Sequence, residues 1–217
     1  MLKHALLATA MAFAAASAQS QVVLMTENFD NVGTLAGSGW IETNASTPGG
    51  TTDWAQGDQT VFPSQSGAPE SYISANYNNA PVGGNISNWL ISPTFSTALG
   101  GTISFFAKAD ILASYADTIA FGLSTTGASA PGSFVLGSGV TLSGDWTQYT
   151  LSFDAQGAGS VARFAINYFG AADSSNYIGI DTVTVTAVPE PATWAMMGLG
   201  LAGLAVMRRR RSSSAAI

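Results

Sequence analysis

The sequence predicts an all-β fold, an antiparallel jelly-roll β-sandwich, with an apolar segment at each end of the chain. Three observations predict it. Short segments of alternating polar and apolar residues, rich in β-branched and aromatic side chains, recur through the middle of the chain. Stretches rich in Gly, Ser and Asn separate these segments, as turns do. Outside the two ends, no segment shows the periodicity of an amphipathic helix, so a sandwich of many short strands is expected.

The N-terminal end has the pattern of a secretory signal. Lys3 is followed by an almost wholly apolar run from Ala5 to Ala16, and Ala16-Ser17-Ala18 supplies the small residues of a cleavage site. We therefore expect residues 1–18 to form a signal helix that signal peptidase removes after Ala18. A permanent N-terminal anchor is disfavoured, because the run is short and ends in a cleavage motif.

The middle of the chain, residues 19–187, is predicted to form one β-sandwich domain. Period-two alternation predicts strands at residues 22–29, 71–75, 88–91, 102–109, 118–124, 146–153, 161–169 and 177–186. Residues 43–79 are polar and rich in turn formers, so we expect extended loops there with one or two short strands.

The C-terminal end, residues 188–217, combines three features of a sorting tail. Pro189-Glu190-Pro191 interrupts regular structure, residues 192–207 are apolar and uncharged, and four arginines follow at Arg208–Arg211. As a helix the apolar run would cover about 24 Å, somewhat less than the roughly 30 Å of a bilayer core. A buried core helix would not end in four arginines, so we predict a transmembrane helix. The arginines place its end in the cytoplasm and the domain outside it.

These tail residues resemble the PEP-CTERM sorting signal of Gram-negative bacteria. The matching residues are Pro189, Glu190, Pro191 and the arginines Arg208, Arg209, Arg210 and Arg211. The resemblance implies that the chain crosses the inner membrane, stays anchored there transiently, and is then processed by a membrane-embedded exosortase. It implies a final place at the cell surface or in the extracellular matrix.

The charge of residues 19–188 excludes several classes of function. Two basic residues, Lys108 and Arg163, stand against twelve acidic ones, so this part of the chain carries a net charge of −10. Nucleic acids and anionic membranes require basic patches, so neither is expected as a partner of the domain. The only histidine is His4, and there is no cysteine. Zinc sites and histidine-based nucleophilic catalysis are therefore not predicted.

An enzyme is not predicted. A serine paired with Lys108, or two of the twelve carboxylates acting as in a glycosidase, would each be compatible with the composition. No motif or spacing selects either arrangement, so a glycan-active enzyme remains the least favoured alternative.

A second resemblance covers residues 24–187. The segments Glu27-Asn28-Phe29-Asp30, Gly39-Trp40, Trp54, residues 88–93, residues 145–149 and residues 177–183 are similar to the choice-of-anchor J domain. That family resembles the cleaved-adhesin and MAM-like jelly rolls and is named for its attachment to varied surface anchors. The resemblance implies an exported β-sandwich and no particular reaction.

Calcium is the one metal for which the sequence offers candidate ligands. Glu27 and Asp30 lie in the first strand region and Asp181 in the last, and these strands commonly meet in a jelly roll. Calcium binds carboxylate and carbonyl oxygens, so a structural Ca²⁺ held by these three acids is one hypothesis. The alternative is that the acids form turns or face solvent.

Two aromatic residues are the candidates for ligand binding. Trp89 and Trp146 follow strand patterns and are expected in the core, whereas Trp54 and Tyr77 fall in the polar region and are predicted to bind a sugar. The sequence thus favours a structural or adhesive protein of the surface or matrix. The alternative is a calcium-dependent carbohydrate-binding module with exopolysaccharide as its partner.

Overall fold

The computed structural model describes residues 21–188 and Gly200, and residues 22–188 form one compact unit. No helix within this described part is long and apolar enough to cross a membrane. The predicted signal helix with Ala16 and Ala18, and the predicted transmembrane helix with Pro189–Pro191 and Arg208–Arg211, lie outside the described residues.

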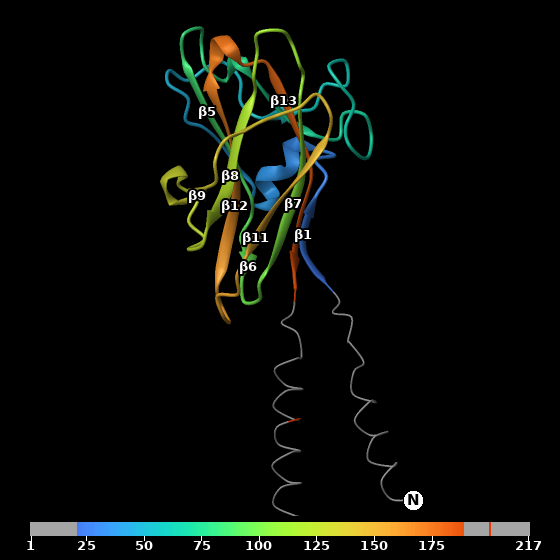
Figure 1. The fold of residues 1–217 in the computed structure, drawn as a ribbon, viewed down its shortest axis with the longest axis vertical. Helices are drawn as coiled ribbons and strands as arrows, with labels where there is room; N and C mark the ends of the chain where they lie inside the picture. The colour runs from blue at the N-terminus through green and yellow to red at the C-terminus, as the bar shows by residue number, and fades with distance from the viewer. Residues whose placement is uncertain (1–20, 189–199, 201–217) are drawn as a thin grey trace, which may run out of the picture. The chain divides into compact units, whose positions relative to one another are not determined.

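Two antiparallel sheets pack face to face, which confirms the all-β sandwich (Figure 1). The first sheet has the strand order β11-β7-β13-β4-β3, and β1 also pairs with β13. Its strands are β1 (Val22–Glu27), β3 (Ala55–Gln56), β4 (Ile73–Asn76), β7 (Gly101–Ala109), β11 (Thr147–Phe153) and β13 (Tyr177–Ala187).

The second sheet has the order β10-β8-β12-β5-β2, with β6 pairing with β12 and β9 with β8. Its strands are β2 (Ile41–Asn44), β5 (Asn85–Ile91), β6 (Phe95–Ser96), β8 (Thr118–Ser124), β9 (Val135–Leu136), β10 (Val140–Thr141) and β12 (Val161–Ala171). Short 3₁₀ turns connect the strands at η1 (Val32–Ser38), η2 (Tyr77–Asn79), η3 (Pro131–Ser133) and η4 (Ala172–Ser174).

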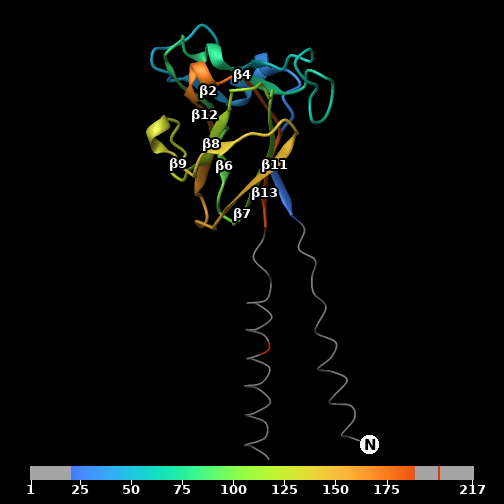
Figure 2. The same ribbon diagram turned by 45° about the horizontal axis from the view of Figure 1, so that its top comes forward.

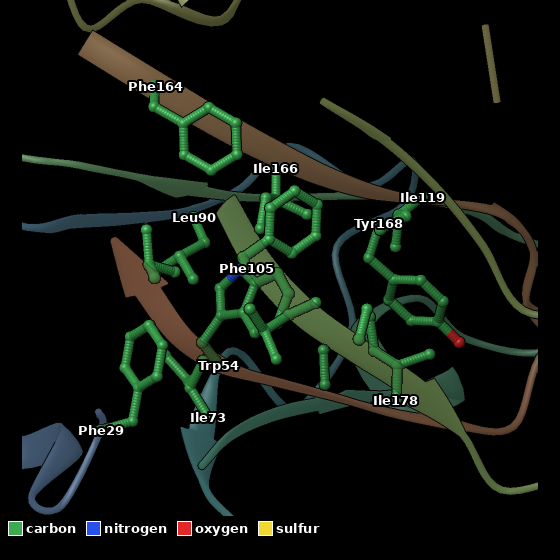
Figure 3. Packing of buried hydrophobic residues seen from close by; sticks show 14 of the residues in the cluster. Phe29, Trp54, Ile73, Leu90, Phe105, Ile119, Phe164, Ile166, Tyr168 and Ile178 are labelled. Carbon is green, nitrogen blue, oxygen red and sulfur yellow. The ribbon is translucent and has the colours of Figure 1, made fainter. Parts of the chain in front are cut away.

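The core lies between the sheets and is built by the alternation seen in the sequence. Alternate residues of β7 and β12 point inward, and rings such as Phe105, Phe164 and Tyr168 pack at its centre (Figure 3). The Phe105 and Phe164 rings lie 5.5 Å apart between centroids. Burial of these apolar faces is the main stabilising contribution of the fold, because the chain has no disulfide.

Strand β13 departs from simple alternation. Ile178 and Ile180 face the core, and after a register shift between Asp181 and Thr184, Val183 and Val185 face it as well. Thr182 takes up the irregularity with φ of 49°. An extra residue in a strand reverses which side chains point inward, so both halves of β13 bury their apolar residues. The regular alternation predicted for residues 177–186 is therefore corrected to a bulged strand.

Candidate binding site

The site is a hollow of about 430 Å³ at one end of the sandwich, which we call the tyrosine hollow. Three loop segments meet there: η2 with the residues after it, the loop from β7 to β8, and η4. In Figure 1 the orange turn η4 lies beside the green segments at this end, and Figure 2 brings the end forward. The lining residues are Tyr77, Asn78, Ala80, Val82, Leu112, Tyr115, Ala172, Asp173, Ser175 and Asn176.

Tyr77 and Tyr115 give the hollow its aromatic character. The two residues are 47% and 43% exposed, so both are partly open to solvent. Large rings are usually buried in a core, so two partly exposed tyrosines lining one hollow make it a candidate binding site. Tyr77, the predicted binding residue, thus lines this hollow together with Tyr115, which the sequence analysis missed.

Local hydrogen bonds hold the Tyr77 segment in place. The Asn76 side chain accepts a hydrogen bond of 2.8 Å from the Asn78 backbone N–H and so caps η2. The Tyr77 N–H donates to the Asn176 carbonyl at 2.9 Å, which joins η2 to the segment after η4. The Tyr77 ring is therefore carried by a turn that two hydrogen bonds stabilise.

Asn176 links the hollow to the core. Its side-chain amide donates to the backbone oxygen of Asp110 at 2.9 Å and to the Asp110 carboxylate at 3.0 Å. Its backbone N–H donates to Asp117 Oδ1 at 2.8 Å, and the Tyr168 hydroxyl donates to the same oxygen at 2.6 Å. Buried polar groups that are fully paired make a rigid support.

Asp117, which is hydrogen-bonded to Asn176 of the hollow, is a buried acid. It is 2% exposed, and this burial raises the pKa of its carboxyl, although the hydrogen bonds from Tyr168 and Asn176 act in the opposite direction. The nearby carboxylate of Asp110 also raises the Asp117 pKa. The pKa of the Tyr168 hydroxyl is also raised, chiefly by burial and then by the charge of Asp117.

Asp173 places a carboxylate at the mouth of the hollow. It is exposed, and its Oδ1 accepts a hydrogen bond of 3.0 Å from the Gly83 N–H, which fixes the loop that carries Val82. Gly83 has φ of +78°, a left-handed conformation that glycine adopts without strain. The hollow therefore combines aromatic, apolar, amide and acidic groups.

Both basic residues of the described chain are engaged elsewhere. Lys108 lies over the Phe62 ring, 4.9 Å from its centroid. Arg163 donates from Nε to the Gly127 carbonyl at 3.0 Å and from Nη1 to the Ser92 carbonyl at 2.6 Å. Neither lines the tyrosine hollow, so the hollow offers no cation to an anionic ligand.

The prediction that Trp54 stacks on a ligand is corrected. Its side chain is only 5% exposed and lies in the hydrophobic core among Ile73, Leu90 and Phe105 (Figure 3). The indole Nε1 is buried and has no hydrogen-bond partner. Polar neighbours in the sequence concealed the burial, because Trp54 directly precedes the edge strand β3 and its side chain packs into the core between the sheets.

Trp54 also lines a second hollow of about 540 Å³, together with Trp40 and Glu42. Burial, and then the charge of Asp53, raise the pKa of the Glu42 carboxyl to about 6. Trp40 is 4% exposed, so neither tryptophan presents a face to a ligand. This second hollow is larger but has fewer exposed rings than the tyrosine hollow.

Of the two tryptophans expected in the core, Trp89 is buried outside the main core and Trp146 is only half-buried, so the expectation is wrong for Trp146. Trp89 is buried in a separate cluster on the outer face of the second sheet, with Phe134 and Ile91. Trp146 is half-buried, and its ring lies 5.7 Å from those of Phe62 and Tyr72.

The structure separates the three acids of the calcium hypothesis into two environments. Asp181 is fully buried, and its Oδ2 accepts hydrogen bonds from the backbone N–H groups of Gln65 at 2.8 Å and Ser66 at 3.1 Å. Burial raises the pKa of the Asp181 carboxyl. Asp30 is exposed, and Glu27 accepts a hydrogen bond of 2.9 Å from the Phe29 N–H.

Asp30 reaches the same loop as Asp181. Asp30 Oδ1 lies near Gly67, 3.4 Å from where a Cβ on that residue would stand, and Asp181 accepts hydrogen bonds from Gln65 and Ser66 of the same loop. Within residues 21–188, no three acidic, histidine or cysteine side chains form a group suited to a metal ion. The calcium site therefore stays a prediction.

Sequence comparison identifies the C-terminal tail. Residues 187–211 match the PEP-CTERM protein-sorting motif. The PEP-CTERM match runs from Ala187 to Arg211, so it includes the Pro-Glu-Pro and arginine residues named from the sequence. It implies export, processing by an exosortase and sorting to the surface. No curated protein sequence matches the chain.

Structure comparison identifies similar folds. The K3 cleaved adhesin domain of Lys-gingipain from Porphyromonas gingivalis W83 is 21% identical, with a TM-score of 0.57 over 77% of this chain and 99% of that chain. The K1 domain of the same protein is 18% identical, with a TM-score of 0.58 over 78% of this chain and 99% of that chain. The K2 domain is 17% identical, with a TM-score of 0.53 over 74% and 96%. At these identities the likeness establishes the β-sandwich fold alone.

Proposed function

We propose that this surface-sorted protein is an adhesive or structural component of the cell surface or extracellular matrix, and that it holds exopolysaccharide in the tyrosine hollow. The observation that carries the proposal is the pair of half-exposed rings, Tyr77 and Tyr115, lining a hollow that also presents polar groups.

The chemistry of the hollow suits a sugar. A pyranose ring has an apolar face of C–H groups and a rim of hydroxyls, so it requires a flat apolar surface beside donors and acceptors. Tyr77 and Tyr115 supply the surface. Asn78 and Asp173 line the same hollow, are exposed, and carry polar groups for the hydroxyls.

The negative charge of the domain favours a neutral or cationic polysaccharide as the ligand. The domain carries a net charge of −10, and both of its bases are engaged in other contacts. An anionic polymer would meet repulsion without a compensating cation. Acidic polysaccharides are therefore excluded from the proposal.

The finer assignments belong to the same proposal. The choice-of-anchor J family is supported by the sequence segments that resemble it and by the β-sandwich of residues 22–188. A structural Ca²⁺ is supported by the position of Asp30 and Asp181 beside the same loop, residues 65–67, and by the cost of burying the Asp181 charge, which a cation would reduce.

A second candidate function is binding of a protein partner at the same end of the sandwich. Two apolar residues that line the hollow are strongly exposed: Val82 is 92% exposed and Leu112 is 48% exposed. Exposed apolar groups gathered in one place are typical of contact surfaces. This alternative needs the apolar rim and does not need the polar groups of the hollow.

Binding of exopolysaccharide from the producing bacterium tests the proposal. The protein is purified after export and processing by that bacterium, and binding is measured by calorimetry with calcium and again with a chelator. Saturable binding that Tyr77→Ala and Tyr115→Ala weaken supports the proposal. Absence of binding in both conditions refutes it and leaves the protein-partner alternative.

A further inference from the structure

Strand β11 is an edge strand without the usual protection. It lies at the end of the first sheet and pairs only with β7, through an unbroken antiparallel register from Thr147 opposite Ala107 to Phe153 opposite Gly101. Within the described chain, no hydrogen bond from outside this ladder reaches the backbone of residues 147–153. The outer edge of β11 therefore presents a row of free N–H and C=O groups.

Proteins ordinarily block such edges with charges, prolines, bulges or very short strands. Among the described edge strands, β3, β6, β9 and β10 have two residues each, and β2 carries Glu42. The edge strand β1 is bulged between Val23 and Met25 and ends at Glu27. Strand β11 reads Thr-Gln-Tyr-Thr-Leu-Ser-Phe, with no charge, no proline and no bulge.

We propose that β11 is an assembly edge and that it pairs antiparallel with β11 of a second copy of this chain. Two copies of one strand related by a two-fold axis pair around a single central residue. With Thr150 at the centre, all seven residues of β11 overlap, and Thr150 lies opposite its own copy. The first sheet then continues from one molecule into the next.

This register suits the side chains. Tyr149 and Leu151 point toward the core side and are only half-buried, and the register places Tyr149 of each copy opposite Leu151 of the other. Aromatic and aliphatic cross-strand pairs are stabilising, and the contact completes the burial of both side chains. On the outer face, Gln148 lies opposite Ser152, so uncharged residues meet there.

Charge explains why a second copy fits better at β11 than elsewhere. The domain is strongly acidic, so most of its surface repels another copy. In the register centred on Thr150, Asp145 lies opposite Ala155 and Asp154 lies opposite Trp146. No two acids meet directly, and like charges placed opposite each other would be destabilising.

Sedimentation of the processed protein over a concentration series tests the pairing. The series reaches about 1 mM, comparable to the local concentration that tethering to one surface produces. Wild type is expected to form dimers as concentration rises. Thr150→Lys places two ammonium groups opposite each other on the solvent face, so it is expected to remain monomeric with an unchanged melting temperature. Thr141→Lys, an exposed threonine of β10 in the other sheet, makes the same charge change and is expected to dimerise like wild type.

Cysteine cross-linking tests the register, because the chain has no native cysteine. Opposed Cα atoms of an antiparallel pair lie about 4.5–5.5 Å apart, within the range that a disulfide spans. Thr150→Cys is therefore expected to cross-link two copies on mild oxidation, whereas Gln148→Cys is not. A protein that stays monomeric throughout the series, or cross-links through Gln148→Cys but not Thr150→Cys, would overturn the proposal.

Discussion

Removal of the two exposed rings offers a quantitative test of the tyrosine hollow. Tyr77 is 47% exposed, which leaves about 90 Å² of a side chain that has roughly 200 Å² of surface. A sugar ring covers one face, or about 45 Å², which corresponds to about 1 kcal/mol at 25 cal/mol per Å². Tyr77→Ala is therefore expected to weaken binding roughly sixfold. Tyr115, at 43% exposure, gives a similar value.

The double variant is expected to lose about 2 kcal/mol, or roughly 40-fold in Kd, if the rings contact different sugar units. Calorimetry with the exopolysaccharide of the producing bacterium measures the loss. Tyr77→Phe keeps the flat face and is expected to bind nearly as well as wild type. Val135→Ala is the matched control, because Val135 is 82% exposed and does not line the hollow. Unchanged affinity of the double variant, with an unchanged melting temperature, would refute the placement of the ligand.

Four further predictions concern stability and processing. Burial raises the pKa of Glu42 from 4.5 to about 6, so the ionised carboxylate destabilises the folded state. The contribution of Glu42 to stability is therefore highest below pH 4.5 and falls as the pH rises through about 6. Glu42→Gln should therefore stabilise the fold at pH 7.5 by roughly 1 kcal/mol after allowance for solvent screening, and not at pH 4, as urea unfolding at the two pH values will show. Trp54→Ala should lower the free energy of unfolding by about 3–5 kcal/mol. Trp54→Phe should lower it by about 1 kcal/mol or less, because it also removes an unpaired buried donor. Equal losses of stability in the two variants would contradict the burial of that N–H. If calcium is bound near Asp181, excess chelator will lower the melting temperature, and no change would reject the calcium site. Intact-mass measurement of the surface protein should give a chain that begins at Gln19 and ends close to Pro189–Pro191, and a retained arginine cluster would contradict exosortase processing.

Most long strands of the fold were predictable from the alternation of polar and apolar residues in the sequence. Strand β8 was predicted at residues 118–124, where the structure has Thr118–Ser124, because Ile119, Phe121 and Leu123 alternate with small or polar residues. The two-residue strand β3 was expected only as an unplaced short strand within residues 43–79, and β6, β9 and β10 were not predicted, since two residues are too few to show a period. The bulge of β13 was also missed, because its register shift depends on pairing with β7.

The site was only partly predictable, because it depends on which loops meet in space. Tyr77 was proposed from its polar surroundings and does line the hollow, but the same reasoning failed for the buried Trp54. Tyr115 lies 38 positions further along the chain, in the loop between β7 and β8. Nothing in the residues around Tyr115 indicates that Tyr77 is its neighbour in space. Asp117 and Asn176 join these loops through a hydrogen bond between residues 59 positions apart.

Mapping the bound polysaccharide on the protein by NMR tests the central claim most directly. Amide chemical shifts are recorded on the labelled, processed protein as oligosaccharides from the producing bacterium's exopolysaccharide are added. The tyrosine hollow predicts that the largest changes fall at residues 77–82, 112–115 and 172–176. Changes centred instead on Trp40, Glu42 and Trp54, or on strand β11, would contradict it.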